Sequence, residues 1–216
     1  MYLVFALVVA VVMPSCKSTS ALEKAREREY KEKMAEYKKG GWSIYGTSHT
    51  FEVALLEHYE KLKKEGAQEL TGVASSFVSK NVGMQSALNS AYTKYAREAQ
   101  SFVRGRAISE IFSDADNVPV EFDKFCTAYE TIIAKEIKGD VKPSYYIIRS
   151  KGKNEKGQEV FEMQAICIVN QNEASKARIE AMENAMKESK LAEEYASKVS
   201  DFIREGFKVD NNTAEE

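Results

Sequence analysis

The hydrophobic positions of the chain follow three different patterns. Residues 2–13 (YLVFALVVAVVM) form one uncharged apolar run. Residues 21–39 are charged almost throughout and have only sparse apolar positions, which predicts an exposed helix that Gly40 and Gly41 end. From residue 42 onward, apolar residues recur every two or every three to four positions, which is typical of strands and amphipathic helices in a packed domain.

The periodic part of the chain predicts a series of strands and helices. Alternating apolar residues predict strands at residues 42–47, 69–78, 145–149 and 160–170. Helical spacing predicts helices at residues 50–65, 82–112, 120–138 and 173–205. Asn172 is placed to cap the last of these helices, and the polar stretch KGKNEKGQ between the last two strands is typical of a β-hairpin. This order predicts an α+β fold, in which long helices pack on a small, mostly antiparallel sheet of three or four strands.

A row of small residues marks the second predicted helix. Ala87, Ala91, Tyr95 and Ala99 recur every four residues and therefore share one face of that helix. Small side chains on such a row let a helix lie close against a sheet or another helix.

The N-terminal apolar run stops just before a cysteine. The run is too short to cross a bilayer as a transmembrane helix, which needs about 20 apolar residues, but it suits the apolar region of a signal peptide. Ser15 precedes Cys16, which is similar to a lipobox, where the leader is cut off and lipid is joined to the thiol. We therefore predict a signal peptide at residues 1–15 and lipidation, for example by palmitate, at Cys16. The usual basic residues before the run are missing, and a plain secretory signal or a retained N-terminal helix are the alternatives.

The residues after the cysteine bear on the destination of the protein. Lys17 stands where an Asp would resemble an inner-membrane retention signal, and no acidic run similar to a surface-export tag follows. We therefore predict attachment to the outer membrane, facing the periplasm, through several acyl chains that each contribute about 0.8 kcal/mol per buried CH2. The predicted layout is a lipid-anchored helical tether at residues 16–41, a single α+β domain at 42–207 and a polar tail at 208–216.

Composition and charge narrow the classes of function. A chain of 216 residues is long enough for one domain or at most two small ones. The formal net charge of −2 gives no reason to expect a nucleic-acid partner. The sequence has no GxSxG, Walker A or GxGxxG motif, so we expect a protein that has no cofactor and is not an enzyme.

Few residues are candidates for metal or thiol chemistry. A metal site needs three or four ligands, and no further ligand residues stand at a metal-binding spacing from His49 or His58. We therefore expect surface or capping roles for both histidines and no metal site. Cys126 and Cys167 both fall on predicted apolar faces. Two separate buried thiols are the favoured interpretation, with a disulfide or a catalytic cysteine as the alternatives.

Aromatic residues gather around the first predicted strand and helix. Trp42, Tyr45, Phe51 and Tyr59 could line a surface that binds a glycan or a peptide. Packing in the core is the commoner use of such side chains and is the alternative.

Two long segments resemble a known group of proteins. The segment LTGVASSFVSKNVGMQSALNSAYTKYAREAQSFVRGR is a strand followed by an alanine-spaced helix, and YYIIRSKGKNEKGQEVFEMQAICIVNQNEASKARIEAM is a hairpin that leads into a helix. Together they resemble the LPP-type small outer-membrane lipoproteins and the related N-terminal domain of the flagellar assembly protein FlgT, over roughly residues 68–186. The whole chain, with WSIYGTSHTFEVALLEHYEKL, is similar to a group of lipoproteins of Bacteroides-type bacteria. The resemblance implies a helix-packed sheet and a role in building the envelope, and it supplies no catalytic residues.

The sequence thus supports two hypotheses of function. The first is a membrane-anchored cell-envelope lipoprotein with a non-enzymatic structural or protein-interaction role, whose partner is another envelope protein or a second copy of the chain. The alternative is a periplasmic ligand-binding lipoprotein for a glycan, peptide or lipid. A pocket with converging polar groups would favour the alternative, whereas a filled core with exposed apolar residues or a free strand edge would favour the first.

Overall fold

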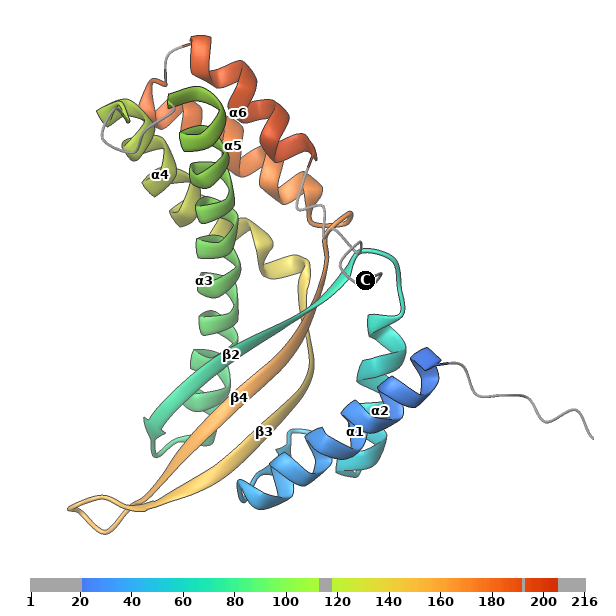
Figure 1. The fold of residues 1–216 in the computed structure, drawn as a ribbon. Coiled ribbons are helices and arrows are strands. Elements are labelled where there is room, and N and C mark those ends of the chain that lie inside the picture. The colour runs from blue at the N-terminus through green and yellow to red at the C-terminus, as the bar shows by residue number, and fades with distance from the viewer. Residues whose placement is uncertain (1–20, 113–117, 192, 206–216) are drawn as a thin grey trace, which may run out of the picture.

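A four-stranded antiparallel sheet lies between two groups of helices in the computed structural model, which describes residues 21–112, 118–191 and 193–205 (Figure 1). The strands are β1 (Ser43–Tyr45), β2 (Ala67–Phe77), β3 (Val141–Lys153) and β4 (Glu159–Asn170). The helices are α1 (Ala21–Lys39), α2 (Phe51–Leu62), α3 (Lys80–Ala107), α4 (Val120–Glu136), α5 (Ser175–Ser189) and α6 (Glu193–Glu205). A π-helical turn, Ile108–Phe112, extends α3, and a 3-10 turn, Ile137–Gly139, extends α4. The predicted α+β class is confirmed.

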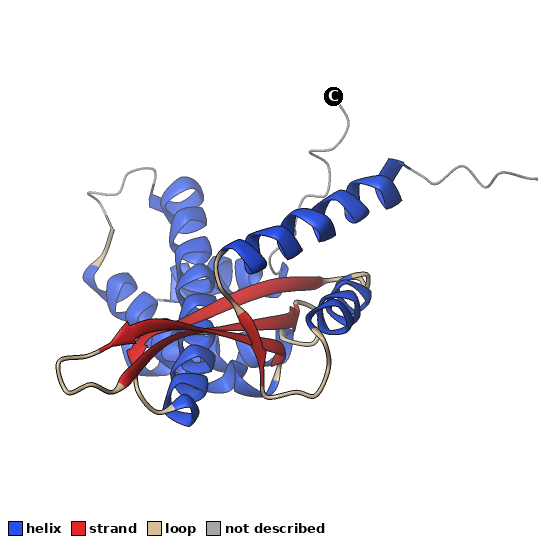
Figure 2. Ribbon diagram, turned by 90° about the horizontal axis from the view of Figure 1, so that it is seen from below, coloured by secondary structure: helices blue, strands red, loops and turns tan. Residues whose placement is uncertain are grey.

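The strand order in the sheet is β1-β3-β4-β2, and every neighbouring pair is antiparallel. β3 and β4 form the predicted hairpin, whose turn is held by the Asn154 side chain as it accepts from the N–H groups of Lys156 and Gln158. α3 packs against β2 and β4 on one face of the sheet, and α1 and α2 lie on the other face (Figure 2). The first two helices of the chain and the helix that follows β2 therefore cover opposite faces of the same sheet.

A β-bulge at Ser144 resets the alternation of β3. Pro143 pairs with Cys167 and Tyr145 pairs with Ile166, so Ser144 is an extra residue in the strand. Because of this slip, Val141 and Ile148 face the same helical layer, although residues seven positions apart would lie on opposite faces of a regular strand. The sequence predicted only residues 145–149 as this strand, since the proline and the broken alternation concealed its first part.

α3 lies unusually close to β2 at Gly72. A Cβ atom at this position would come within 2.0 Å of the Ala87 carbonyl oxygen and 2.9 Å of the Ala91 Cβ. Ala87, Ala91 and Ala99 are fully buried, and Tyr95 is 2% exposed. The predicted row of small residues therefore forms the face of α3 that meets the sheet.

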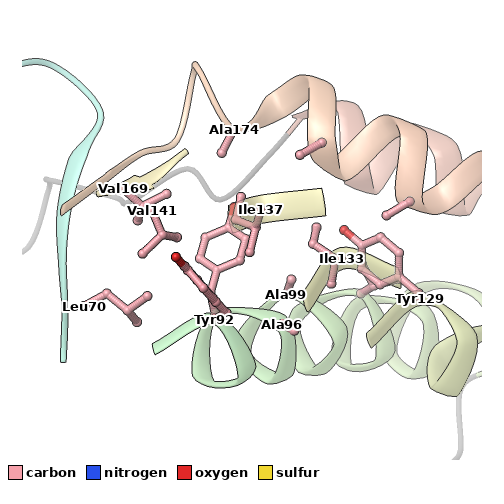
Figure 3. Close-up of a cluster of buried hydrophobic side chains, with 14 of the residues drawn as sticks. Leu70, Tyr92, Ala96, Ala99, Tyr129, Ile133, Ile137, Val141, Val169 and Ala174 are labelled. Carbon is pink, nitrogen blue, oxygen red and sulfur yellow. The ribbon is translucent and has the colours of Figure 1, made fainter. Parts of the chain in front are cut away.

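The main core fills the space between the sheet and α3 to α6. α4 packs on α3, α5 packs on α4, and α6 packs on α5 and α3. Figure 3 shows Leu70 and Val141 from the sheet converging with Tyr92 and Ile137. The buried side of α4 consists of Phe122, Phe125, Tyr129 and Ile133, and that of α6 consists of Val199, Phe202 and Ile203.

The last predicted helix is in fact two helices. Lys190 adopts a left-handed conformation with φ of 55° and ends α5, so that α6 turns back toward α3. The prediction of one helix over 173–205 was wrong because a lysine, unlike a glycine, gives no signal of such an end. Asn172 does not cap the helix either. The Asn170 side chain accepts from the N–H groups of Asn172 and Glu173, and so closes the turn before α5.

The helix that was expected to be a tether contributes to the packed domain. Met34 and Tyr37, in the last turns of α1, are 8% and 2% exposed. The side chains of residues 24–29, nearer to the start of α1, are exposed. The boundary at residue 42 stays a prediction, but α1 joins the domain through these two side chains.

We predict that Gly72→Ala lowers the free energy of unfolding by about 1–3 kcal/mol, because the added methyl group meets the backbone of α3 and forces the two elements apart. Gly105→Ala in the same helix is the matched control, since nothing lies within 4 Å of its Cβ position. We expect this variant to be about 0.5–1 kcal/mol more stable than the wild type, as alanine is the better helix former. Urea unfolding of the two variants measures both effects, and equal stabilities would contradict the close approach.

Candidate functional site

A second, smaller buried cluster lies between the sheet and the pair α1 and α2. Its buried members are Met34, Tyr37, Ala54, Leu55, Tyr145, Ile147 and Ile166. Three segments that are far apart in the sequence meet here: α1, α2 and the paired strands β3 and β4. Several residues with titratable side chains lie in the same region, so this cluster is the first candidate site.

His58 and Glu69 form a polar pair at this cluster. The Thr50 side chain caps α2 by accepting from the Val53 N–H, and helical spacing places His58 on the same face as Ala54 and Leu55. His58 is fully buried, and its Nε2 lies 2.7 Å from Oε2 of Glu69 on β2. The hydrogen bond from His58 is the main reason that the pKa of Glu69 is lowered.

The prediction of a surface or capping role for His58 was wrong. Its position three and four residues after Leu55 and Ala54 marks it as part of the inner face of α2, a signal that was present in the sequence. His49 lies apart from it before α2, where its Nδ1 is 3.5 Å from Oε1 of Glu57. No group of three or more His, Cys, Asp or Glu side chains in the described part of the chain could hold a metal ion.

Two tyrosines join α1 to the sheet beside this pair. The hydroxyl oxygens of Tyr37 and Tyr145 are 3.1 Å apart, and the edge of the His58 ring meets the Tyr145 ring at 5.4 Å between centroids. Burial raises the pKa of Tyr37 to about 12 and raises that of Tyr145 as well. Both phenols therefore stay protonated at neutral pH. Hydrogen bonds within this cluster hold the elements together, although the buried Nδ1 of His58 has no hydrogen-bond partner in the described structure.

The four aromatic residues predicted as a ligand surface are not brought together as one. Trp42, Phe51 and Tyr59 pack at the border of the second cluster, whereas Tyr45 packs against the main core on the other face of the sheet. The Arg149 guanidinium lies 4.5 Å from the Trp42 ring centroid. A Cβ on Gly40 would come within 2.7 Å of the same ring. The Arg149 side chain and the Gly40 backbone therefore already pack against Trp42. These aromatic residues therefore serve packing.

A buried polar network on the other face was not predicted. Arg178 of α5 is 4% exposed, and its Nη1 donates to the Tyr95 hydroxyl at 3.0 Å and to Oε1 of Gln171 at 2.9 Å. The Gln171 Nε2 donates in turn to Oε1 of Gln68 at 2.6 Å. The network joins α3, α5 and β2 at the turn after β4. Arginine is mostly an exposed residue type, so its sequence position gave no reason to place it inside.

The two cysteines of the domain are separate and buried. Cys126 and Cys167 are both free, which confirms the favoured interpretation and shows the disulfide alternative to be wrong. Burial raises the pKa of Cys167 to about 12 and also raises that of Cys126, so neither is an activated nucleophile. Cys16, the predicted lipidation site, lies outside the described residues.

An open groove of about 370 Å³ lies between the C-terminal end of α2 and the start of β3. Its lining residues are Lys61, Lys64, Ala67, Asp140, Lys142, Pro143, Ser144, Ile168, Asn170 and Glu173. They come from three separate segments, which is why no local sequence pattern revealed the groove. It shares no lining residue with the cluster of His58 and Glu69, and several charged side chains surround its open space.

No protein-family model, curated protein sequence or solved structure matches the chain. Among the described helices, none is both long and apolar enough to cross a membrane. The function is therefore argued from the residues and their geometry.

We predict that Glu69→Gln lowers the free energy of unfolding by about 1 kcal/mol at neutral pH, because it removes the charge from the hydrogen bond with His58. The expected loss in the free energy of unfolding is modest because the Glu69 side chain is 38% exposed and solvent screens the pair. A lowered carboxyl pKa stabilises the fold above the ordinary value of 4.5, and this stabilisation is lost as the pH falls through the folded-state pKa. The difference between wild type and variant should therefore vanish at acidic pH.

Urea unfolding at a series of pH values measures this difference. Glu65→Gln is the control, because Glu65 is exposed and its carboxylate has no hydrogen bond or ion pair in the described structure. A Glu69→Gln effect that is constant across the acidic range would contradict the role of the charged pair.

Proposed function

We propose that this chain is a membrane-anchored cell-envelope lipoprotein with a non-enzymatic structural or protein-interaction role, attached to the outer membrane through lipid on Cys16 and facing the periplasm. The observation that carries the proposal is the apolar run at residues 2–13, which stops just before Cys16, with α1 beginning five residues after this cysteine. α1 in turn is joined to the folded domain by Met34 and Tyr37. Anchor, helix and domain thus follow one another without a long linker.

The dimensions of this connection support a short arm. Five residues reach at most about 18 Å when fully extended. α1 has 19 residues and, at a rise of 1.5 Å per residue, is about 28 Å long. The Lys31–Glu27 ion pair, one turn apart on its exposed side, suits a helix surrounded by water. A lipid on Cys16 would therefore hold the domain near the membrane surface at a restricted distance.

The arrangement of polar groups supports a role without catalysis. The His58–Glu69 pair and the two tyrosines beside it are engaged with one another within a packed layer. The thiols of the domain are buried and have raised pKa values. His58, the two tyrosines and the two thiols are buried and therefore lack the open access that a nucleophile or a general base needs.

The corner between β2 and α3 supports contact with a protein partner. Val78 is 44% exposed and Val82 is 58% exposed, and the corner lies far from the first turn of α1 (Figure 1). β2 is also an edge strand, although the Ser90 hydroxyl already accepts from the outward N–H of Val73. We infer that another envelope protein covers this corner, because it points away from the side on which the anchor would lie. The groove beside α2 is the specific observation that favours the alternative, a ligand-binding lipoprotein.

The anchor is tested by the intact mass and the membrane fractionation of full-length wild type and Cys16→Ala. We expect the wild type to carry several acyl chains and to sediment with membranes, and the variant to lose the lipid mass and the membrane association. Ser18→Ala, two residues away, is the control and should behave as wild type. A wild type that carries no lipid and remains in the soluble fraction would show the proposal to be wrong.

The protein contact is tested by photo-cross-linking in intact cells. A photoreactive residue at Val78 or Val82 should give one discrete heavier product, because a partner covers both side chains. The same residue at Lys187, an exposed position of α5, is the control and should give none. A product of twice the mass of the chain would indicate a second copy in place of another protein, and no discrete product at either valine would contradict the contact.

A further inference from the structure

The groove beside α2 takes its charged side chains from different segments: two lysines come from the end of α2, and both carboxylates come from the start of β3 and the turn after β4. Lys61 and Lys64, from the last turn of α2 and the residues just after it, form one wall. Neither has an ion-pair partner in the described part of the chain, whereas their neighbour Lys63 lies 2.5 Å from Oε1 of Glu60 and does not line the groove. This wall therefore carries two positive charges that no acidic side chain balances.

The opposite wall is acidic on balance. It contains Asp140 and Glu173 with a single lysine, Lys142, whose Nζ is 4.0 Å from Oε2 of Glu173. Burial is the main reason that the pKa of Asp140 is raised. One positive charge between two carboxyl groups leaves this wall with the capacity to bind a cation.

The floor of the groove is apolar apart from one hydroxyl. Ala67, Pro143 and Ile168 supply the apolar surface. The bulge of β3 places Ser144 at the groove, and its buried Oγ has no hydrogen-bond partner within the described structure. A buried hydroxyl without a partner is uncommon, because leaving it unpaired costs about 1–3 kcal/mol.

We propose that this groove binds a zwitterionic ligand, an amino acid or a short peptide with both ends free. The ligand carboxylate lies against Lys61 and Lys64, and the ligand ammonium group lies against Asp140 and Glu173. The apolar floor receives the body of the ligand. A volume of about 370 Å³ is at the small end of the range of ligand pockets, which suits a ligand of this size.

The distribution of charge selects this class over a simple anion. A phosphate placed between the walls would meet the lysines on one side, but Asp140 and Glu173 would repel it on the other. A ligand with a charge of each sign meets an opposite charge at both walls. The site is independent of the proposed lipid anchor and of the protein contact at Val78 and Val82, since it involves neither.

The proposal is tested by isothermal titration calorimetry of the purified full-length chain in mild detergent. The probes are glycine, dialanine and trialanine, each compared with its N-acetyl, C-amide form. We expect saturable binding of at least one free-ended probe and none of the blocked forms. The variant Lys61→Ala/Lys64→Ala should lower the affinity at least tenfold, because it removes the positive wall, and Asp140→Asn should also lower it.

Lys63→Ala is the matched control, since it removes a lysine of the same turn that is paired and lies outside the groove, and it should bind as the wild type does. Circular dichroism checks that the variants are folded, which is expected because both replaced lysines are exposed. The proposal is overturned if no free-ended probe binds saturably at millimolar concentration. It is equally overturned if blocked and free-ended probes bind alike, or if the double variant binds as tightly as the Lys63→Ala control. None of these results depends on whether Cys16 carries lipid.

Discussion

The close approach of α3 to β2 at Gly72 is the contact on which the helical layer depends. Only a residue without a Cβ fits beneath the Ala87 carbonyl, and only alanines on the facing row of α3 permit that distance. With α3 fixed there, Tyr95 on the same row reaches Arg178 and Gln171. The position of α5 and of the turn that precedes it therefore follows from a contact made by a strand and a helix much earlier in the chain.

The other face of the sheet is closed by paired polar groups as well as by apolar packing. Burying a polar side chain is costly unless it finds a partner, and here Tyr37 meets Tyr145 while His58 meets Glu69. These pairs have directional geometry, which apolar contacts lack. α1 thus has a defined seat on the domain although, among its side chains with described burial, only Met34 and Tyr37 are almost fully buried.

The sequence allowed the fold class and most elements to be predicted, because periodicity, glycines and the hairpin turn are local signals. It failed where the structure departs from regular alternation. The bulge at Ser144 hid the first part of β3, and the left-handed Lys190 hid the division between α5 and α6. Both depend on how distant elements pack, since neither residue type favours its conformation by itself.

The candidate sites were harder to predict than the fold. The alternation of β1 already implied that Tyr45 faces away from Trp42, and the spacing of α2 already implied that His58 faces inward. The groove is different in kind, because its residues come from the end of α2, the start of β3 and the turn after β4. No spacing rule relates these segments, and only the sheet register brings them together.

α2 contacts both α1 and the groove. Its inner face packs against α1 and the sheet through Ala54 and Leu55 and meets β3 through His58, and its last turn supplies Lys61 to the groove. The proposed ligand of the groove would therefore contact the same helix that packs against α1. Such a ligand changes the seating of α1 only to the extent that it binds the seated and unseated forms with different affinity. Phe51, in the first turn of the same helix, packs against Tyr37 of α1 at 4.9 Å between ring centroids, so α2 contacts the seat of α1 at one end and the groove at the other.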